Sequence, residues 1–240
     1  MRRLAGTERR SRGSDGEATR RDGETVAHPA GGTFFVPTAV SSNMSESEVR
    51  VVAIVGSLRE QSYTRRAAAH ALEAATDAGA ETELLDLRSF DLPTFDADVD
   101  RESAGDAEAL AAAVRDADAV VLATPVYHGS YSSPLKTALD YCGFEEFEDK
   151  TVGLLAVSGG AFPITALDHL RSVCRALNAW VLPHEAAVPR SSAAFEDGGF
   201  ADGDTAERVA TLGRRTVQYA RIEPDPDSFE SGQNVGARGK

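Results

Sequence analysis

Apolar residues in the middle of the chain follow two alternating patterns. Residues 49–55 form a nearly continuous β-branched run, which is typical of a strand buried on both faces. Residues 64–78 instead place apolar side chains at helical spacing, and Gly79 follows where a helix would end. Residues 81–87 return to the strand pattern. This alternation predicts parallel strands joined by crossover helices.

The same alternation continues to residue 220. A helix through residues 114 and 117 is expected to be capped by Ser103, and Pro134 suits the first turn of another helix. The remaining elements that we predict are strands at 119–123, 151–157 and 180–182, and helices at 135–141, 164–177 and 205–220. This order predicts an α/β fold of the flavodoxin-like type, a doubly wound five-stranded parallel sheet in the order 2-1-3-4-5 with helices on both faces.

The two ends of the chain lack both periodicities. Residues 1–47 and 223–240 are rich in small, polar and charged residues, so we expect a disordered N-terminal extension and a disordered C-terminal tail around one domain at 48–222. Met44 stands just before the first strand. We hypothesise that Met44 is the natural start and that the upstream segment is an over-extended reading frame.

The excess of acidic residues limits the kinds of molecule that the protein is expected to bind. The chain has 25 basic and 38 acidic residues, and residues 44–240 carry 18 and 33 of them, a net charge of −15. Such a surface repels nucleic acid and anionic lipid, and no apolar run approaches the length needed to span a bilayer. Only three basic residues are lysines. We therefore expect a cytoplasmic, halophilic protein that binds neither nucleic acid nor membrane.

Two cysteines, Cys142 and Cys174, lie within apolar helical patterns. A free thiol in such a position usually behaves as a small core residue. We expect a reduced compartment and no catalytic cysteine, and we predict no metal site.

The predicted topology indicates where a ligand would bind. In a sheet of this order, ligands bind outside the carboxyl ends of the strands where the strand order reverses, here between the first and third strands. The loops that follow Val55, Ala123 and Val157 are therefore the candidates.

The first of these loops predicts an anion site. Ser57, Ser62 and Thr64 would donate hydroxyl hydrogen bonds, Arg59 would add a charge-assisted one, and the backbone from Tyr63 onward would offer N–H groups at a helix N-terminus. The alternative is that Ser62 only caps the helix. Neither a G-x-G-x-x-G fingerprint nor a Walker loop is present, so a mononucleotide phosphate is the favoured ligand.

The second and third loops suit a flat heterocycle. A rigid proline, a glycine and two aromatic residues in residues 124–134 can place backbone N–H groups along its polar edge and apolar side chains on one face. The candidates in these two loops are Pro125, Val126, Tyr127, His128, Gly129, Ser130, Ser158, Gly159 and Gly160. Tyr127 could instead pack on the sheet edge, and the last three residues could form a tight turn. For His128 we favour an exposed loop residue without a role.

These motifs resemble the NADPH-dependent FMN reductase family over about residues 49–190. Gly56-Ser57-Leu58-Arg59 with Ser62 is similar to its phosphate loop, residues 124–127 with Leu135-Lys136 and Asp140 to its segment beside the isoalloxazine, and Ser158-Gly159-Gly160 to its third flavin loop. Family members often have Asn where this chain has Thr64 and His128. The second departure leaves the pyridine-nucleotide and substrate preference open.

The resemblance implies an FMN enzyme. Hydride would pass from NADPH or NADH to the flavin, and electrons would then pass to a small-molecule acceptor such as a flavin or quinone by a ping-pong mechanism. The flavin carries the chemistry, so no catalytic side chain is expected. Backbone N–H groups of residues 126–130 and 159–160 would stabilise the reduced ring. The resemblance also implies a homodimer or homotetramer.

Alternatives remain open from the residues. A flavodoxin-type one-electron carrier would bind FMN without reacting with NAD(P)H, but Arg59 in the loop and a single tryptophan, Trp180, disfavour it. No feature supports a non-catalytic flavin-binding regulator. Arg59 could also contact a phosphate of NADPH, although we favour the FMN phosphate.

Overall fold

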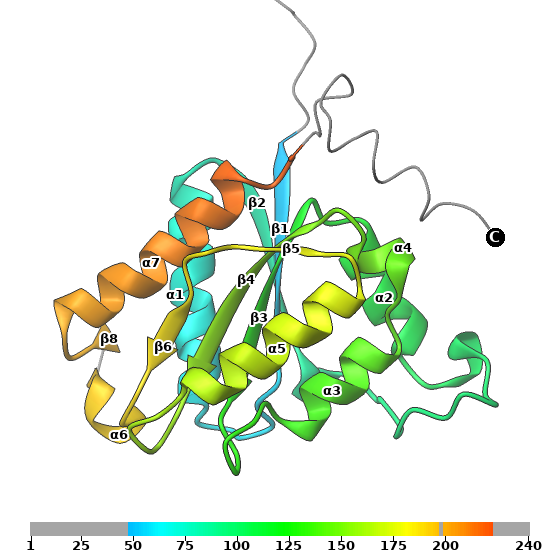
Figure 1. Ribbon diagram of the computed structural model, residues 1–240, viewed down its shortest axis with the longest axis horizontal. Coiled ribbons are helices and arrows are strands. Elements are labelled where there is room, and N and C mark those ends of the chain that lie inside the picture. The colour runs from blue at the N-terminus through cyan, green and yellow to red at the C-terminus, as the bar shows by residue number, and fades with distance from the viewer. Residues whose placement is uncertain (1–47, 197–198, 223–240) are drawn as a thin grey trace, which may run out of the picture. The chain divides into compact units, whose positions relative to one another are not determined.

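The computed structural model describes residues 48–196 and 199–222, and its central feature is a parallel sheet (Figure 1). The strands are β1 (Val49–Val55), β2 (Ala80–Asp86), β3 (Ala119–Pro125), β4 (Thr151–Val157), β5 (Trp180–Val181) and β6 (Ala186–Val188). They lie in the order β2-β1-β3-β4-β5, and β6 also pairs with β4. The predicted doubly wound topology is confirmed. The proposed extension, tail and Met44 start fall outside the described residues and stay predictions.

The fifth position of the sheet is divided between two short strands. β5 pairs with the start of β4, at Thr151 and Val152, and β6 pairs with its end, from Leu155 to Val157. Pro183 lies between the two pieces and has no N–H to donate to a ladder. The single strand predicted at residues 180–182 is therefore shorter than expected, and β6 was not predicted.

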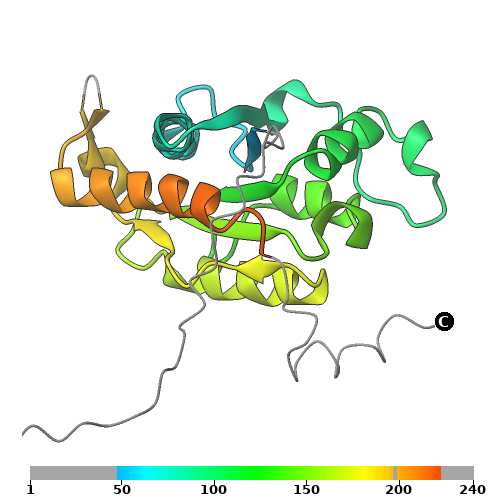
Figure 2. The same ribbon diagram turned by 90° about the horizontal axis from the view of Figure 1, so that it is seen from above.

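Helices cover both faces of this sheet. They are α1 (Tyr63–Asp77), α2 (Ala107–Arg115), α3 (Ser133–Asp140), α4 (Phe144–Phe147), α5 (Ile164–Ala176), α6 (Ser191–Ala194) and α7 (Gly203–Gln218). Helices α1 and α7 pack on one face, and α2, α3 and α5 pack on the other (Figures 1 and 2). Among the described residues, no helix is both long and apolar enough to cross a bilayer.

The β-branched run of β1 is explained by this two-sided cover. Val51 and Val55 belong to the hydrophobic cluster on the α1 and α7 face, whereas Val52 and Ile54 belong to the cluster on the other face. All four side chains are fully buried. A strand with apolar partners on both sides loses the polar alternation of a surface strand.

One predicted helix start is wrong. Ser103 ends a short 3₁₀ turn, Arg101–Ser103, and α2 begins only after Asp106. Gly105 has a φ of +58°, and a Cβ at this position would lie 2.2 Å from the carbonyl oxygen of Asp91. The chain must turn at this glycine before the helix can begin, because only glycine fits this close approach.

A small hairpin follows β6 and was also not predicted. It consists of β7 (Phe195–Glu196) and β8 (Gly199–Phe200), which pair antiparallel. Strands of two residues carry no readable periodicity. The hairpin lies against α1, through contacts described below.

Candidate functional site

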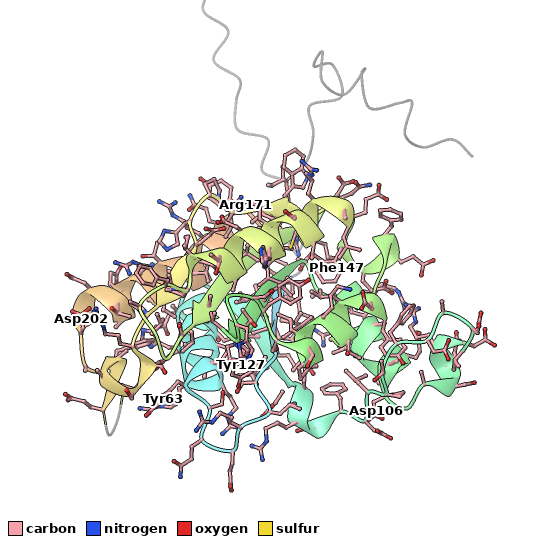
Figure 3. The ribbon with its side chains drawn as sticks, turned by 60° about the horizontal axis from the view of Figure 1, so that its bottom comes forward. Tyr63, Asp106, Tyr127, Phe147, Arg171 and Asp202 are labelled. Atoms are coloured by element: carbon pink, nitrogen blue, oxygen red, sulfur yellow. The ribbon has the colours of Figure 1, made fainter. Side chains whose placement is uncertain are left out.

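Three loops meet at the carboxyl ends of β1, β3 and β4. The Gly56 N–H donates to the Ala123 carbonyl oxygen at 2.8 Å, and the Val126 N–H donates to the Val157 carbonyl oxygen at 2.9 Å. The loops therefore lie side by side along the lower edge of Figure 1, and Figure 3 turns this edge forward with Tyr63 and Tyr127 labelled. The structure places the predicted site residues on these loops or on the first turn of α1, except for Pro125, which is the last residue of β3.

The first loop leaves its backbone donors free. Within residues 48–196 and 199–222, the N–H groups of residues 57–64 donate to no other protein atom. Ser62 is the N-cap of α1, and its hydroxyl oxygen accepts from the Arg65 N–H at 3.1 Å. Ser62 therefore caps the helix, and its O–H still has a proton to donate to a ligand. Free N–H groups at a helix N-terminus favour an anion.

Side chains add further unused donors. Ser57 and Thr64 are each only 2% exposed, and their hydroxyl groups have no hydrogen-bond partner in the described part of the chain. Arg59 is exposed and forms no ion pair there. By contrast, Arg65 donates to Asp86 at 3.0 Å and to the Glu60 carbonyl oxygen at 2.6 Å, which ties the loop to the end of β2. The chemistry of this donor set fits a phosphate dianion.

Tyr63 contributes its backbone to this donor set. Its ring stacks on Phe195 of β7, with centroids 5.1 Å apart and planes 16° apart. The side chain is thus committed to packing, and its N–H remains among the free donors of the first turn.

The second loop is a tight reversal at residues 127–130. The N–H groups of Tyr127 and Ser130 each donate to the other's carbonyl oxygen at 3.0 Å. His128 has a φ of +50° and Gly129 a φ of +78°, so both central residues adopt the left-handed conformation of a type I′ turn. Asn-Gly favours this turn, and histidine is among the non-glycine residues enriched at positive φ, so His128 suits the position.

This geometry reduces the number of backbone N–H groups in residues 126–130 that are available to stabilise a reduced flavin ring. The N–H groups of Val126, Tyr127 and Ser130 are used within the protein, whereas those of His128 and Gly129 have no partner among the described residues. Tyr127 is 48% exposed, so its ring is not packed away on the sheet edge.

The turn is fixed to α5 by two contacts. Thr165 donates its hydroxyl proton to the Gly129 carbonyl oxygen at 2.6 Å, and the Ser130 hydroxyl lies 3.0 Å from Nδ1 of His169. Neither Thr165 nor His169 was predicted to support the site. No local signal could have found them, because each lies more than 35 residues from its partner.

The third loop is held from the other side. The Ser158 hydroxyl oxygen accepts from the Gly160 N–H at 3.0 Å, and the Gly160 carbonyl oxygen accepts from the Arg190 N–H at 2.8 Å. Of the two glycines, only Gly159 therefore keeps a free N–H among the described residues. Gly159 and Gly160 are both exposed, and at Gly159 a Cβ would meet nothing within 4 Å.

Ser132 joins the first two loops and was missed by the sequence analysis. It is 1% exposed, its hydroxyl donates to the Gly56 carbonyl oxygen at 2.7 Å, and its N–H donates to Thr124 Oγ1 at 3.0 Å. A Cβ on Gly56 would lie 2.6 Å from Ser132 Oγ, so only glycine fits there. The usable signal was the position of Ser132 two residues before Pro134, which is typical of a helix N-cap.

Three ionisable groups with shifted pKa values, Cys142, Cys174 and Glu146, lie outside the three loops. Burial raises the pKa of Cys142 and Cys174 to about 12, so neither thiol ionises near neutral pH. Burial alone would raise the pKa of Glu146, but the Gly143 N–H and the Arg115 guanidinium outweigh it and hold that pKa below its usual value. This carboxylate ties α4 to α2.

A known protein family matches the part of the chain that contains the three loops. The model of the family described as NADPH-dependent FMN reductase matches residues 49–193. An FMN-dependent NADPH-azoreductase of Staphylococcus aureus is 35% identical over 155 residues, which cover 61% of this chain and 81% of that protein.

Solved structures share the fold. An oxidoreductase from Corynebacterium diphtheriae has a TM-score of 0.63 at 23% identity, covering 74% of this chain and 99% of its own. A flavoenzyme NAD(P)H:(acceptor) oxidoreductase from Paracoccus denitrificans has a TM-score of 0.60 at 22% identity, covering 72% and 97%. At these identities the likeness concerns the fold.

Proposed function

Because this chain belongs to the NADPH-dependent FMN reductase family, we propose that it holds FMN at the three strand-end loops and passes electrons from NAD(P)H to a second, small-molecule acceptor by a ping-pong mechanism. The coarser part of this statement, an FMN-dependent oxidoreductase that uses NAD(P)H, follows from the family. The single observation that carries the site assignment is the row of free N–H groups at residues 57–64. The site residues, the acceptor and the kinetic order are proposals.

The first loop would hold the FMN phosphate. The N–H groups of the first turn of α1 and the hydroxyls of Ser57 and Thr64 are donors without partners in the described chain. Arg59 would add a positive charge from the exposed side of the loop. Such donors are directed at an anion before it arrives, so binding costs little reorganisation.

The other two loops would hold the ring. When bound, the flavin supplies hydride and electron transfer. The free N–H groups of His128, Gly129 and Gly159 would donate to its polar edge and favour the negative charge of the reduced form. Tyr127 would contact one face of the ring, and the contacts of Thr165 and His169 would hold the turn in place.

The acceptor is proposed as a class. The azoreductase relative favours an azo dye, and the resemblance to the NADPH-dependent FMN reductase family implies a flavin or quinone as further acceptors. We also propose a homodimer or homotetramer, because Leu58, Phe162 and Ile164 expose 54%, 80% and 50% of their surface on or next to the loops of this edge.

Anaerobic mixing tests the proposal. Protein loaded with FMN and mixed with NADPH, and separately with NADH, should lose its yellow absorbance rapidly, and a quinone or azo dye added after removal of the nucleotide should restore it. Restoration without NADP⁺ present is the signature of the ping-pong order. A one-electron carrier would keep its colour when NAD(P)H is added, and failure to retain FMN after desalting would refute the site.

A further inference from the structure

The β7–β8 hairpin contacts α1 directly beside the proposed phosphate loop. We propose that Phe195 of this hairpin is a positioning residue that fixes the first turn of α1 and thereby sets the affinity for the phosphate of FMN. The proposal rests on the proposed function. It assigns a role to an element that the sequence did not predict.

The first contact between the hairpin and α1 is the stack of the Phe195 and Tyr63 rings. Tyr63 is the first residue of α1 and follows the cap Ser62. Phe195, only 7% exposed, lies almost parallel to its ring at 5.1 Å and is itself 4.4 Å from Phe200. Aromatic pairs at these distances attract beyond their buried area, and two-χ side chains lose little entropy when held.

Arg66 adds a second attachment one turn along the helix. Its guanidinium carbon lies 4.8 Å from the centre of the Phe195 ring and 5.9 Å from that of Tyr63. One terminal nitrogen donates to the carbonyl oxygens of Glu196 at 2.6 Å and Gly199 at 3.4 Å. The hairpin is thus bound to the first two turns of α1 by a stack and a cation above it.

The contact between the hairpin and α1 is not closely packed along its whole length. An open surface groove of about 610 Å³ runs along the same junction, with Arg66, His70, Phe195 and Phe200 among its lining residues. Arg66 and His70 also join α1 to this region, but Phe195 alone stacks on Tyr63 among the described residues, so removing its ring would leave the first turn of α1 less constrained.

Loss of the Phe195 ring should weaken binding of the FMN phosphate and not binding of the flavin ring. Helix ends fray unless they are held, and the free N–H groups of Tyr63 and Thr64 point usefully only while that turn keeps its geometry. The isoalloxazine would instead contact the turn at residues 127–130, which is fixed by α5. Riboflavin has the same ring without the phosphate, so it separates the two effects.

The experiment compares two ligands in matched variants. Dissociation constants for FMN and riboflavin are measured by quenching of flavin fluorescence in wild type, Phe195→Ala and Phe195→Tyr. Phe195→Ala should weaken FMN binding about fivefold to tenfold and leave riboflavin binding within twofold, whereas Phe195→Tyr should restore the wild-type ratio. Phe195→Leu, which keeps an apolar side chain, replaces Phe195→Ala if the latter does not fold.

His70→Ala is the matched control. His70 lies two turns into α1, contacts Phe200 edge-on at 5.3 Å and bonds the Ala206 carbonyl oxygen at 3.2 Å, so it joins the same helix to the same region. It should leave the FMN to riboflavin ratio unchanged.

The outcomes separate the two proposals. Equal weakening of both ligands in Phe195→Ala, an equal change of the ratio in His70→Ala, or no recovery in Phe195→Tyr would overturn the positioning role while FMN binding stands. A wild-type protein that binds neither flavin would overturn the proposed function itself.

Discussion

At the scale of single residues, Arg59 is a cation of the proposed site that forms no ion pair among the described residues. Seven of the fourteen arginines in the described part of the chain pair with a carboxylate, as Arg65 does with Asp86 and Arg171 does with Glu185. In a chain with a large excess of acids, an arginine without an ion pair in the described part of the chain is available to another anion. Its position in a loop of free N–H groups makes a phosphate the fitting partner.

Replacement of Arg59 tests this directly. Arg59→Ala should raise the dissociation constant for FMN about tenfold, because one charge-assisted hydrogen bond is lost while the backbone donors remain. Flavin fluorescence titration measures it. Arg88→Ala removes the same charge from another exposed arginine, just after β2, and should leave FMN affinity unchanged. Unchanged FMN affinity with a raised KM for NADPH would assign Arg59 to the nucleotide instead.

At the scale of elements, the contact between α1 and α7 fixes the position of α1 on the sheet. Helix α7 approaches α1 so closely that a Cβ at Gly213 would lie 1.9 Å from the Ala71 carbonyl oxygen and 3.2 Å from its Cα. The clashing atoms are backbone, so no side-chain movement can relieve the contact. Because α1 begins at the proposed phosphate loop, this packing also supports the site.

Gly213→Ala should therefore be strongly destabilising. Added volume in a close helix contact typically costs about 1–3 kcal/mol, and a backbone clash favours the upper end of that range. Urea denaturation measures the change in the free energy of unfolding. Gly203→Ala in the same helix is the matched control, because a Cβ there meets nothing within 4 Å, and it should be neutral or slightly stabilising. Equal stability of the two variants would contradict the clash.

Charge acts at the scale of the whole molecule. The formal net charge of −13 opposes compaction by self-repulsion, which salt screens over a distance that falls from about 10 Å at 0.1 M to about 3 Å at 1 M. We therefore expect the thermal midpoint to rise between about 0.1 M and about 2 M KCl. Sorbitol at equal osmolality, which carries no ions, serves as the control. A midpoint that stays constant or falls with KCl would contradict the halophilic interpretation.

Sequence alone determined the order of the main strands and helices. A strand or helix that is buried on one or two faces needs apolar residues at a regular spacing, and this spacing can be recognised in the local sequence. Val49–Val55 and Thr151–Val157 were predicted to the residue for this reason. Topology then placed the ligand loops at one edge, and motifs in those loops identified the family. The helix start near Ser103 failed because Gly105 packs against Asp91, a contact that no local pattern records.

Tertiary structure alone decided which groups of those loops are free to act. Ser132 reaches Gly56 across 76 residues of sequence, His169 lies beside Ser130, and Phe195 takes up the ring of Tyr63. The bonds within the turn at residues 127–130 likewise leave only some N–H groups unpaired. Such contacts depend on the register and packing of distant elements, and a residue's type and local spacing do not specify where those elements meet.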